Sequence, residues 1–255
     1  MIFYYSTVFI VGLCIGSFLN VIVFRLDRKT GILMGRSECS SCSGQLKWYD
    51  LIPLISYVYL RGNCRYCKAE ISAIYPLVEL TTGLAVFSYF WVNGLMFGSS
   101  DIFSLVFISL FLLLIFFDAL YFILPDKIVF TAIGAALFYD VIFRRPDLYN
   151  LLLSGFLSSL AFAIIYLASR GEWMGFGDVK LVFAIGLVLG YPLGIFAMVV
   201  AVWTAALWGI ILLLLKKANR KTALPFGSFL SAATIVFIIF ENVIEEKINV
   251  IWQLF

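Results

Sequence analysis

Eight apolar runs, separated by short polar segments, dominate the pattern of the chain. Most runs approach the ~20 residues that an α-helix needs to cross a bilayer, although the sixth and the eighth are shorter. The pattern therefore predicts an all-α polytopic membrane protein with about eight transmembrane helices, the first of them a retained helix and not a cleaved signal. The runs cover residues 2–24, 73–92, 102–122, 128–143, 151–168, 179–190, 193–215 and 226–240.

Composition and charge agree with this class of protein. Hydrophobic residues make up 63% of the chain and charged residues 13%, far from the balance of a soluble domain. The loops on one side of an eight-helix arrangement hold 15 of the 18 Lys and Arg residues. By the positive-inside rule this side is predicted to be cytoplasmic, with both termini outside. The net charge of +3 says little by itself, because the positive residues are spread along membrane-flanking loops. They form no recognisable nucleic-acid module, so the expected partner is the lipid bilayer and not a nucleic acid.

One polar insert, residues 25–72, interrupts the apolar pattern between the first and second predicted helices. It carries two Cys-x2-Cys pairs, a spacing typical of a tetrahedral zinc site, formed by Cys39, Cys42, Cys64 and Cys67. Disulfides are the alternative, and a reducing cytoplasm disfavours them. Four thiolates fill the zinc coordination shell, so such a metal would be structural and not catalytic. Cys14 is left over and is expected to be a small packing residue of the first helix.

Two aspartates, Asp118 and Asp178, lie at the edges of apolar runs in a chain without histidine. Ionisable side chains at membrane depth are costly and usually functional, and nucleophile pairs that need His cannot be assembled here. The eight-helix topology places both residues at one depth on the cytoplasmic side. If they share a site, like-charge repulsion leaves one proton between them, as in an aspartic protease. We therefore predict a carboxylate pair that activates water to cleave a peptide bond.

Residues near the acidic groups leave other interpretations open. Gly175 and Gly177 would permit unusual backbone dihedrals and the close approach of an extended peptide. For Asp178, and for Asp126 after Pro125, the alternative is a helix N-cap. Glu79 lies one turn inside the second run, where it would either face a polar cavity or extend to the cytoplasmic interface.

Several further motifs follow one another along the chain. They are Gly16-Ser17-Phe18-Leu19-Asn20-Val21; the four cysteines with Trp48-Tyr49-Asp50-Leu51-Ile52-Pro53 between them; Ile71-Ser72; Tyr75-Pro76-Leu77-Val78-Glu79; Asp118 with Leu124-Pro125-Asp126; and Gly175-Phe176-Gly177-Asp178-Val179-Lys180-Leu181. In this order they resemble the motifs of the bacterial type IV prepilin peptidases, also called leader peptidase/N-methyltransferases. The resemblance covers nearly the whole chain.

The resemblance implies a membrane aspartic endopeptidase of the bacterial cytoplasmic (inner) membrane, with its active site and cysteine loop facing the cytoplasm. Such an enzyme removes the basic leader of type IV prepilins or pseudopilins after a glycine, and many then methylate the new N-terminus with S-adenosylmethionine. The implied catalytic residues are Asp118 and Asp178, and the cysteines are the implied metal ligands. Supporting roles would fall to Gly175, Gly177, Asp126 and Lys180.

The resemblance also suggests how the chain is organised. Residues 1–92, including the insert, would form the methyltransferase part, and residues 93–255 the peptidase part. Candidates for the methyl-transfer site are Glu79, Gly16, Ser17, Asn20 and Asp50.

Two positions depart from the family pattern. Arg often precedes the Tyr-Pro motif, where this chain has Ile74, and a late Pro-x-Gly-Pro pattern here reads Pro225-Phe226-Gly227-Ser228. Neither change is expected to touch the aspartates, whereas loss of the Arg makes methyl transfer less secure than cleavage. Other functions stay open: an intramembrane aspartic protease that cuts other transmembrane substrates, a proton-coupled transporter, or a scaffold for pilus assembly.

Overall fold

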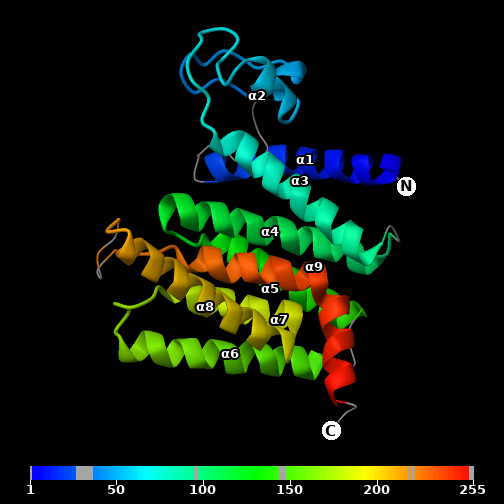
Figure 1. The fold of residues 1–255 in the computed structure, drawn as a ribbon, viewed down its shortest axis with the longest axis vertical. Helices are drawn as coiled ribbons and strands as arrows, with labels where there is room; N and C mark the ends of the chain where they lie inside the picture. Colours follow the sequence, from blue (N-terminus) through cyan, green and yellow to red (C-terminus); the bar gives the residue numbers. More distant parts are fainter. Residues whose placement is uncertain are drawn as a thin grey trace. The chain divides into compact units, whose positions relative to one another are not determined.

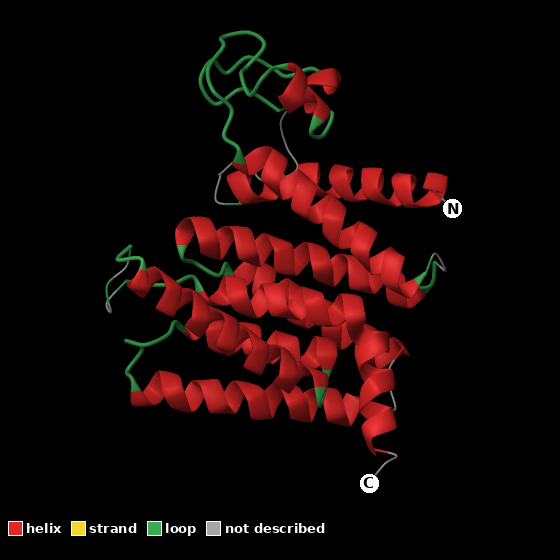
Figure 2. Ribbon diagram, viewed as in Figure 1, coloured by secondary structure: helices red, strands yellow, loops and turns green. Residues whose placement is uncertain are grey.

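The computed structural model describes residues 2–26, 37–94, 97–143, 148–217, 219 and 222–252. The regular structure in these ranges is helical (Figure 2), apart from two isolated β-bridges, Glu38 with Gln45 and Asn63 with Glu70. The chain divides into two compact units, Met1–Leu95 and Met96–Phe255. The prediction of an all-α fold with a cysteine-bearing insert after the first helix is confirmed.

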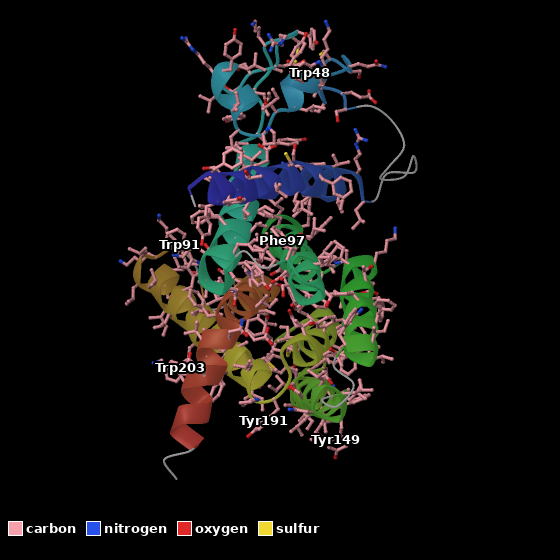
Figure 3. The ribbon with its side chains drawn as sticks, turned by 90° about the vertical axis from the view of Figure 1, so that its right-hand side faces the viewer. Trp48, Trp91, Phe97, Tyr149, Tyr191 and Trp203 are labelled. Atoms are coloured by element: carbon pink, nitrogen blue, oxygen red, sulfur yellow. The ribbon has the colours of Figure 1, made fainter. Side chains whose placement is uncertain are left out.

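The first unit consists of two long helices that pack together and the insert that joins them. The long helices are α1 (Ile2–Arg25) and α3 (Ile74–Asn93). The insert contains two short helical turns, η1 (Trp48–Leu51) and α2 (Ile55–Tyr59). The insert is rich in polar residues and turns, and its Trp48 side chain (labelled in Figure 3) is largely exposed.

Glycines bring α1 and α3 close together. A Cβ on Gly12 would lie 2.9 Å from the Cα of Gly83, and a Cβ on Gly16 would lie 2.7 Å from the Cα of Glu79. Small residues four positions apart allow membrane helices to approach backbone to backbone. The close approach brings polar residues of α1 next to Glu79 of α3.

The second unit, in its described residues, contains six helices (Figure 1). The central helix α7 packs against α5, α6, α8 and α9, and α9 also packs against α4 and α8. Ten of the 14 residues of α7 are buried, which explains why this helix is apolar on every side. The six helices are α4 (Ser99–Tyr121), α5 (Asp126–Phe143), α6 (Leu148–Ala168), α7 (Phe176–Leu189), α8 (Leu193–Leu214) and α9 (Phe226–Trp252).

Five helices among the described residues are long and apolar enough to cross a membrane: Phe3–Arg25, Ser99–Tyr121, Leu148–Ala168, Leu193–Leu214 and Phe226–Ile244. The outward-facing side chains are often large and apolar, as for Trp203 in Figure 3. The chain is therefore a multi-pass membrane protein. By contrast, α7 has 14 residues, about 21 Å at 1.5 Å per residue and short of the ~30 Å hydrocarbon layer. The number of eight transmembrane helices stays a prediction.

Candidate active site

Asp118 lies in the last turn of α4 and is buried, with 6% of its surface exposed. Its Oδ2 accepts a hydrogen bond from the backbone N–H of Ser228 at 2.6 Å and another from the Ser228 hydroxyl at 3.0 Å. Its backbone carbonyl accepts a hydrogen bond from Phe122, the left-handed residue that ends α4. A buried carboxyl is thus held at a helix end by donors from α9.

Asp178 lies in the first turn of α7 and is 8% exposed. Its Oδ2 accepts a hydrogen bond from the backbone N–H of Gly175, the residue that precedes the helix, at 3.2 Å. Asp178 is therefore not the N-cap itself, because it sits two residues inside the helix and closes the first turn from there. The Asp118 and Asp178 carboxyl groups are close enough for their like charges to repel each other.

One apolar side chain, Leu124, connects the segments that carry the two acids. A Cβ on Gly177, next to Asp178, would lie 3.2 Å from the Leu124 Cβ. A Cβ on Gly227 would lie 2.9 Å from Leu124 Cδ2 and 3.2 Å from Oδ2 of Asp118. Leu124 thus fills the space beside both glycines, and the starts of α7 and α9 meet the end of α4 around it.

The glycines before Asp178 serve a different purpose from the one expected. Gly175 has φ −77° and ψ 151°, an extended conformation open to any residue, and Gly177 lies in regular helix. Neither needs the left-handed region, so the expectation of unusual dihedrals is wrong. The missing side chain of Gly177 matters because Leu124 occupies the space it would need.

Lys180, near the start of α7, and Asp126, the first residue of α5, form an ion pair. The Lys180 ammonium also lies over two aromatic rings, 5.3 Å from the centroid of Phe176 and 5.6 Å from that of Phe130. The Asp126 side chain is 61% exposed, so water screens much of the attraction. The pair links the start of α5 to the N-terminal part of α7, which also carries Asp178.

Ser228 is the residue of this site that the sequence analysis missed. The change of the late Pro-x-Gly-Pro pattern to Ser228 was expected to leave the aspartates untouched, and that expectation is wrong, because Ser228 hydrogen-bonds Asp118 twice. The two residues are 110 positions apart, so no local pattern joins them. One signal in the sequence was available. Pro225 before an apolar run marks the start of a helix, and the first N–H groups of a helix need acceptors from elsewhere, as the N–H of Ser228 does.

The four cysteines of the insert lie together. Their Sγ atoms all lie within 4.8 Å of one another, and those of Cys39 and Cys67 are 3.8 Å apart. Tetrahedral zinc thiolate geometry with bonds of ~2.3 Å places sulfurs ~3.8 Å apart. The cysteines are free, so the disulfide alternative is not observed. The cluster is positioned to bind a metal ion.

The two halves of the cluster repeat the same backbone turn. The N–H of Ser43 donates to the carbonyl of Cys39 at 2.9 Å, and the N–H of Lys68 donates to that of Cys64 at 3.0 Å. Ser43 and Lys68 both adopt positive φ, 54° and 60°. Backbone N–H groups of Ser41 and Cys42 lower the pKa of the Cys39 thiol to about 6, which favours the thiolate that binds metals. Two matched turns therefore present four thiol groups to one point.

The carboxylate of Glu79 lies where α1, α3 and the insert meet, and it is 8% exposed. Its Oε2 accepts a hydrogen bond from the backbone N–H of Leu54 at 2.9 Å, and Ser17 lies within hydrogen-bonding reach. Nearby on α1, Asn20 donates from Nδ2 to the Tyr75 carbonyl at 3.0 Å, and its buried Oδ1 has no hydrogen-bond partner. Of the methyl-transfer candidates, Glu79, Gly16, Ser17 and Asn20 lie along one helix contact.

Asp50 is instead bound within the insert. Its carboxylate accepts hydrogen bonds from Nε of Arg65 at 2.7 Å and from the backbone N–H of Lys47 at 3.2 Å. Burial opposes ionisation of this carboxyl, but the contacts with Arg65 and Lys47 outweigh it and lower the pKa of Asp50. Arg65 also stacks over the Tyr49 ring at 5.0 Å. Asp50 therefore has a structural partner in the folded insert.

Cys14 is exposed on α1, so the expectation that it packs inside the protein is wrong. The first helix turns a different face, that of Gly12 and Gly16, toward α3.

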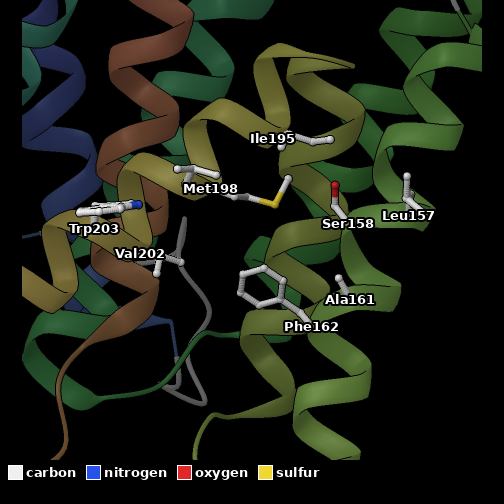
Figure 4. Close-up of a pocket in the computed structure, with 9 residues that line it drawn as sticks. Leu157, Ser158, Ala161, Phe162, Ile195, Met198, Val202 and Trp203 are labelled. Atoms are coloured by element: carbon white, nitrogen blue, oxygen red, sulfur yellow. The ribbon is translucent and has the colours of Figure 1, made fainter.

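An apolar groove of about 330 Å³ runs between α6 and α8 (Figure 4). None of its lining residues is titratable, so the groove cannot supply acid–base chemistry. Phe162 of this lining stacks on Phe226, the first residue of α9, with ring centroids 6.2 Å apart. The lining residues are Leu157, Ser158, Ala161, Phe162, Ile195, Met198, Val199, Val202 and Trp203.

Two family models match the chain, one in each unit. The model of the bacterial peptidase A24 N-terminal domain matches residues 10–93. The model of the type IV leader peptidase family matches residues 105–214, which include Asp118 and Asp178. No solved structure matches the chain significantly.

Curated relatives named prepilin leader peptidase/N-methyltransferase match most of the chain. The protein of Aeromonas salmonicida (strain A449) is 30% identical over 90% of this chain and 88% of its own length. That of Bacillus subtilis (strain 168) is 31% identical over 91% and 92%, respectively. That of Vibrio cholerae serotype O1 (strain ATCC 39315 / El Tor Inaba N16961) is 34% identical over 71% and 76%.

Proposed function

Since this chain belongs to the type IV leader peptidase family, we propose that it is a membrane aspartic endopeptidase that processes prepilins or pseudopilins. It removes the basic leader after a glycine and then methylates the new N-terminus. Family membership favours this activity over a transporter, a scaffold, or a protease for other transmembrane substrates.

The observation that carries the proposal is the buried pair Asp118 and Asp178. Both residues are less than a tenth exposed, their charges interact, and the chain has no histidine that could serve as the base. Two acids in one buried site share a proton, which supplies a base and an acid together. These two residues are therefore assigned as the catalytic pair.

In this mechanism the ionised carboxylate takes a proton from a water molecule. The water oxygen bonds to the scissile carbonyl carbon as its O–H bond breaks, and the protonated partner donates a hydrogen bond to the carbonyl oxygen, where negative charge develops. The tetrahedral intermediate then collapses. Its C–N bond breaks, and the proton taken from water passes to the leaving amine.

The proposal locates the site at the membrane surface, on the side where the predicted topology gathers Lys and Arg. Asp118 ends α4 and Asp178 begins α7, so both carboxyl groups lie at helix ends. The excess of basic loop residues on that side supports a cytoplasmic orientation in the bacterial inner membrane. A basic leader would stay in the cytoplasm while the apolar remainder of the substrate enters the lipid, which places the scissile bond beside the two acids.

The cysteine cluster is assigned to structural Zn²⁺. Its four sulfurs fit a tetrahedral thiolate site that leaves no position open for water. Zinc there would cross-link a segment with few buried apolar side chains, and so would stabilise the fold of the insert.

The first unit is proposed to hold S-adenosylmethionine, which supplies a transferable methyl group when bound. The fit rests on acceptors: the Glu79 carboxylate suits a cationic group, and the buried Oδ1 of Asn20 still lacks a donor. Gly16 and Ser17 of α1 both lie next to Glu79. The division of the chain after Leu95 supports separate methyltransferase and peptidase parts.

The test is to incubate the purified protein in detergent with a prepilin, with and without S-adenosylmethionine, and to measure product masses. The proposal predicts loss of the leader in both reactions and an added methyl mass only with the donor. An unchanged substrate mass, under conditions in which an active relative cleaves, would reject the peptidase. Cleavage without methylation would reject the second activity alone.

A further inference from the structure

We propose that Ser228 is a positioning residue that anchors Oδ2 of Asp118 in both protonation states of that acid, so that Oδ1 is the oxygen that exchanges the catalytic proton. This inference rests on the proposed function, because it concerns how one member of the acid pair works. It follows from the hydrogen bonds of Ser228 with Asp118 and Ile115 and from the close packing of Gly227.

Two donors of Ser228 converge on one oxygen. The backbone N–H lies 2.6 Å from Oδ2 of Asp118, and the hydroxyl Oγ lies 3.0 Å from the same atom. Ser228 is in the first turn of α9, where the helix dipole favours a negative partner. Its N–H also lies 3.2 Å from the carbonyl oxygen of Pro225, so the bond is shared, and the shorter of the two contacts is the one with Oδ2 of Asp118. Oδ2 is thus occupied, and Oδ1 is the oxygen left for chemistry.

The hydroxyl of Ser228 has two acceptors for its single proton. Besides Oδ2 of Asp118, the carbonyl oxygen of Ile115 lies 3.2 Å from Oγ. With Asp118 ionised, the hydroxyl donates to Oδ2. With Asp118 protonated, it can rotate and donate to Ile115 while the backbone N–H still binds Oδ2. Rotation of the Ser228 hydroxyl thus keeps both this hydroxyl and the Asp118 carboxyl group hydrogen-bonded when Asp118 gains or loses its proton.

Gly227 makes this contact possible. A Cβ at position 227 would lie 3.2 Å from Oδ2 of Asp118 and 2.9 Å from Leu124 Cδ2. Both distances are shorter than ordinary van der Waals contact, so a side chain there would require Leu124 and the Asp118 carboxyl group to shift. The absence of a side chain at Gly227 therefore allows the Ser228 N–H to approach the Asp118 carboxyl group.

The reaction cycle uses this arrangement twice. As water is activated, its proton forms a bond with Oδ1, and Oδ2 keeps the hydrogen bond from the Ser228 N–H. When the proton leaves Oδ1 for the departing amine, the hydroxyl of Ser228 returns to Oδ2. The carboxyl group keeps its orientation while its charge changes.

The experiment compares Ser228→Ala with Ser231→Ala in cleavage of a prepilin by the full-length protein in detergent. Ser231 is a matched control, since it is buried one turn further along α9 and its hydroxyl has no hydrogen-bond partner. Ser228→Ala is expected to lower kcat by about 10-fold to 100-fold, the effect of one hydrogen bond to a charged group. KM should stay within about twofold, and Ser231→Ala should change neither constant by more than about twofold.

A second pair of variants, Ser228→Thr and Ser228→Val, tests the role of the hydroxyl even if the alanine variant does not fold. Ser228→Thr keeps the hydroxyl and Ser228→Val has nearly the same volume without it, so Thr should retain at least about ten times the kcat of Val. Equal kcat in these two variants, or equal losses in Ser228→Ala and Ser231→Ala, would overturn the inference. If the wild type cleaves and Ser228→Ala has the same kcat, this inference fails while the peptidase stands. If the wild type does not cleave, both fail.

Discussion

Leu124 occupies the space that a side chain at Gly177 would need, because an added Cβ would lie 3.2 Å from the Leu124 Cβ. Gly177 precedes Asp178 in the first turn of α7, and Leu124 follows the end of α4, where Asp118 lies. The packing of the segments that carry the two acids therefore includes a contact that only a glycine allows without a shift of Leu124.

Replacement of Gly177 by Ala should move Asp178 away from Asp118. We expect a loss of at least about tenfold in prepilin cleavage, since small displacements of catalytic groups are costly. Gly134→Ala on α5 is the matched control, because a Cβ there would meet nothing within 4 Å. Cleavage rates of the two variants, compared in one detergent, provide the measurement. Full activity in Gly177→Ala would show that the contact with Leu124 does not set the site.

The ion pair of Lys180 with Asp126 should contribute modestly. Lys180→Met and Asp126→Asn are each expected to lower cleavage by less than about tenfold, because exposed pairs contribute ~0.2–1 kcal/mol. A double-mutant cycle on the cleavage rate measures the coupling. If Lys180→Met were as inactive as a variant of either catalytic acid, Lys180 would have to take part in the chemistry.

Removal of cysteines should remove the metal. The double variant Cys39→Ser/Cys64→Ser is expected to lose bound zinc, from about one ion per chain to nearly none, and its insert should become sensitive to protease. Elemental analysis of the purified protein measures the first effect and limited proteolysis the second. Cys14→Ser, outside the cluster, is the control and should keep its zinc. Equal zinc in the double variant and the parent would remove the site.

Glu79→Gln should separate the two activities. The Gln side chain keeps an acceptor for the Leu54 N–H but loses the charge that suits a cationic methyl donor. We expect methylation to fall by at least about tenfold while cleavage stays within about twofold, as measured from product masses. Glu70→Gln, on the exposed surface of the insert, should leave both activities unchanged. Parallel loss of cleavage and methylation in Glu79→Gln would indicate a structural role instead.

The apolar runs predicted the helices well because a helix that crosses a membrane needs about 20 consecutive apolar residues, which are visible in the sequence. The described long helices overlap the eight runs, and several begin with polar residues outside them, as α4 does at Ser99. The largest difference is α9, which continues to Trp252 although its apolar run ends at residue 240. Beyond that point acidic residues continue the helix, and a search for apolar runs does not find them.

The candidate site was predictable where its chemistry is local. The Cys-x2-Cys spacing encodes a turn of the backbone, so the cluster could be predicted from the sequence, and two acids at run edges could be found by their charge. Leu124 and Ser228 could not, because their roles depend on contacts between α4, α7 and α9. A motif can also mislead. Asp50 lies in a motif and was a candidate for methyl transfer, but its carboxylate binds Arg65 within the insert.

The proposed peptidase activity requires Asp118 and Asp178 to act as one catalytic unit. The direct measurement is the prepilin cleavage rate of Asp118→Asn, Asp178→Asn and the double variant, each checked for folding, with Asp101→Asn at the opposite end of α4 as the control. We predict that each single variant loses at least about 10³-fold and that the double variant loses no more than either, since residues that act as a unit are not additive. A single variant that keeps cleavage within about tenfold of the wild type would contradict the account.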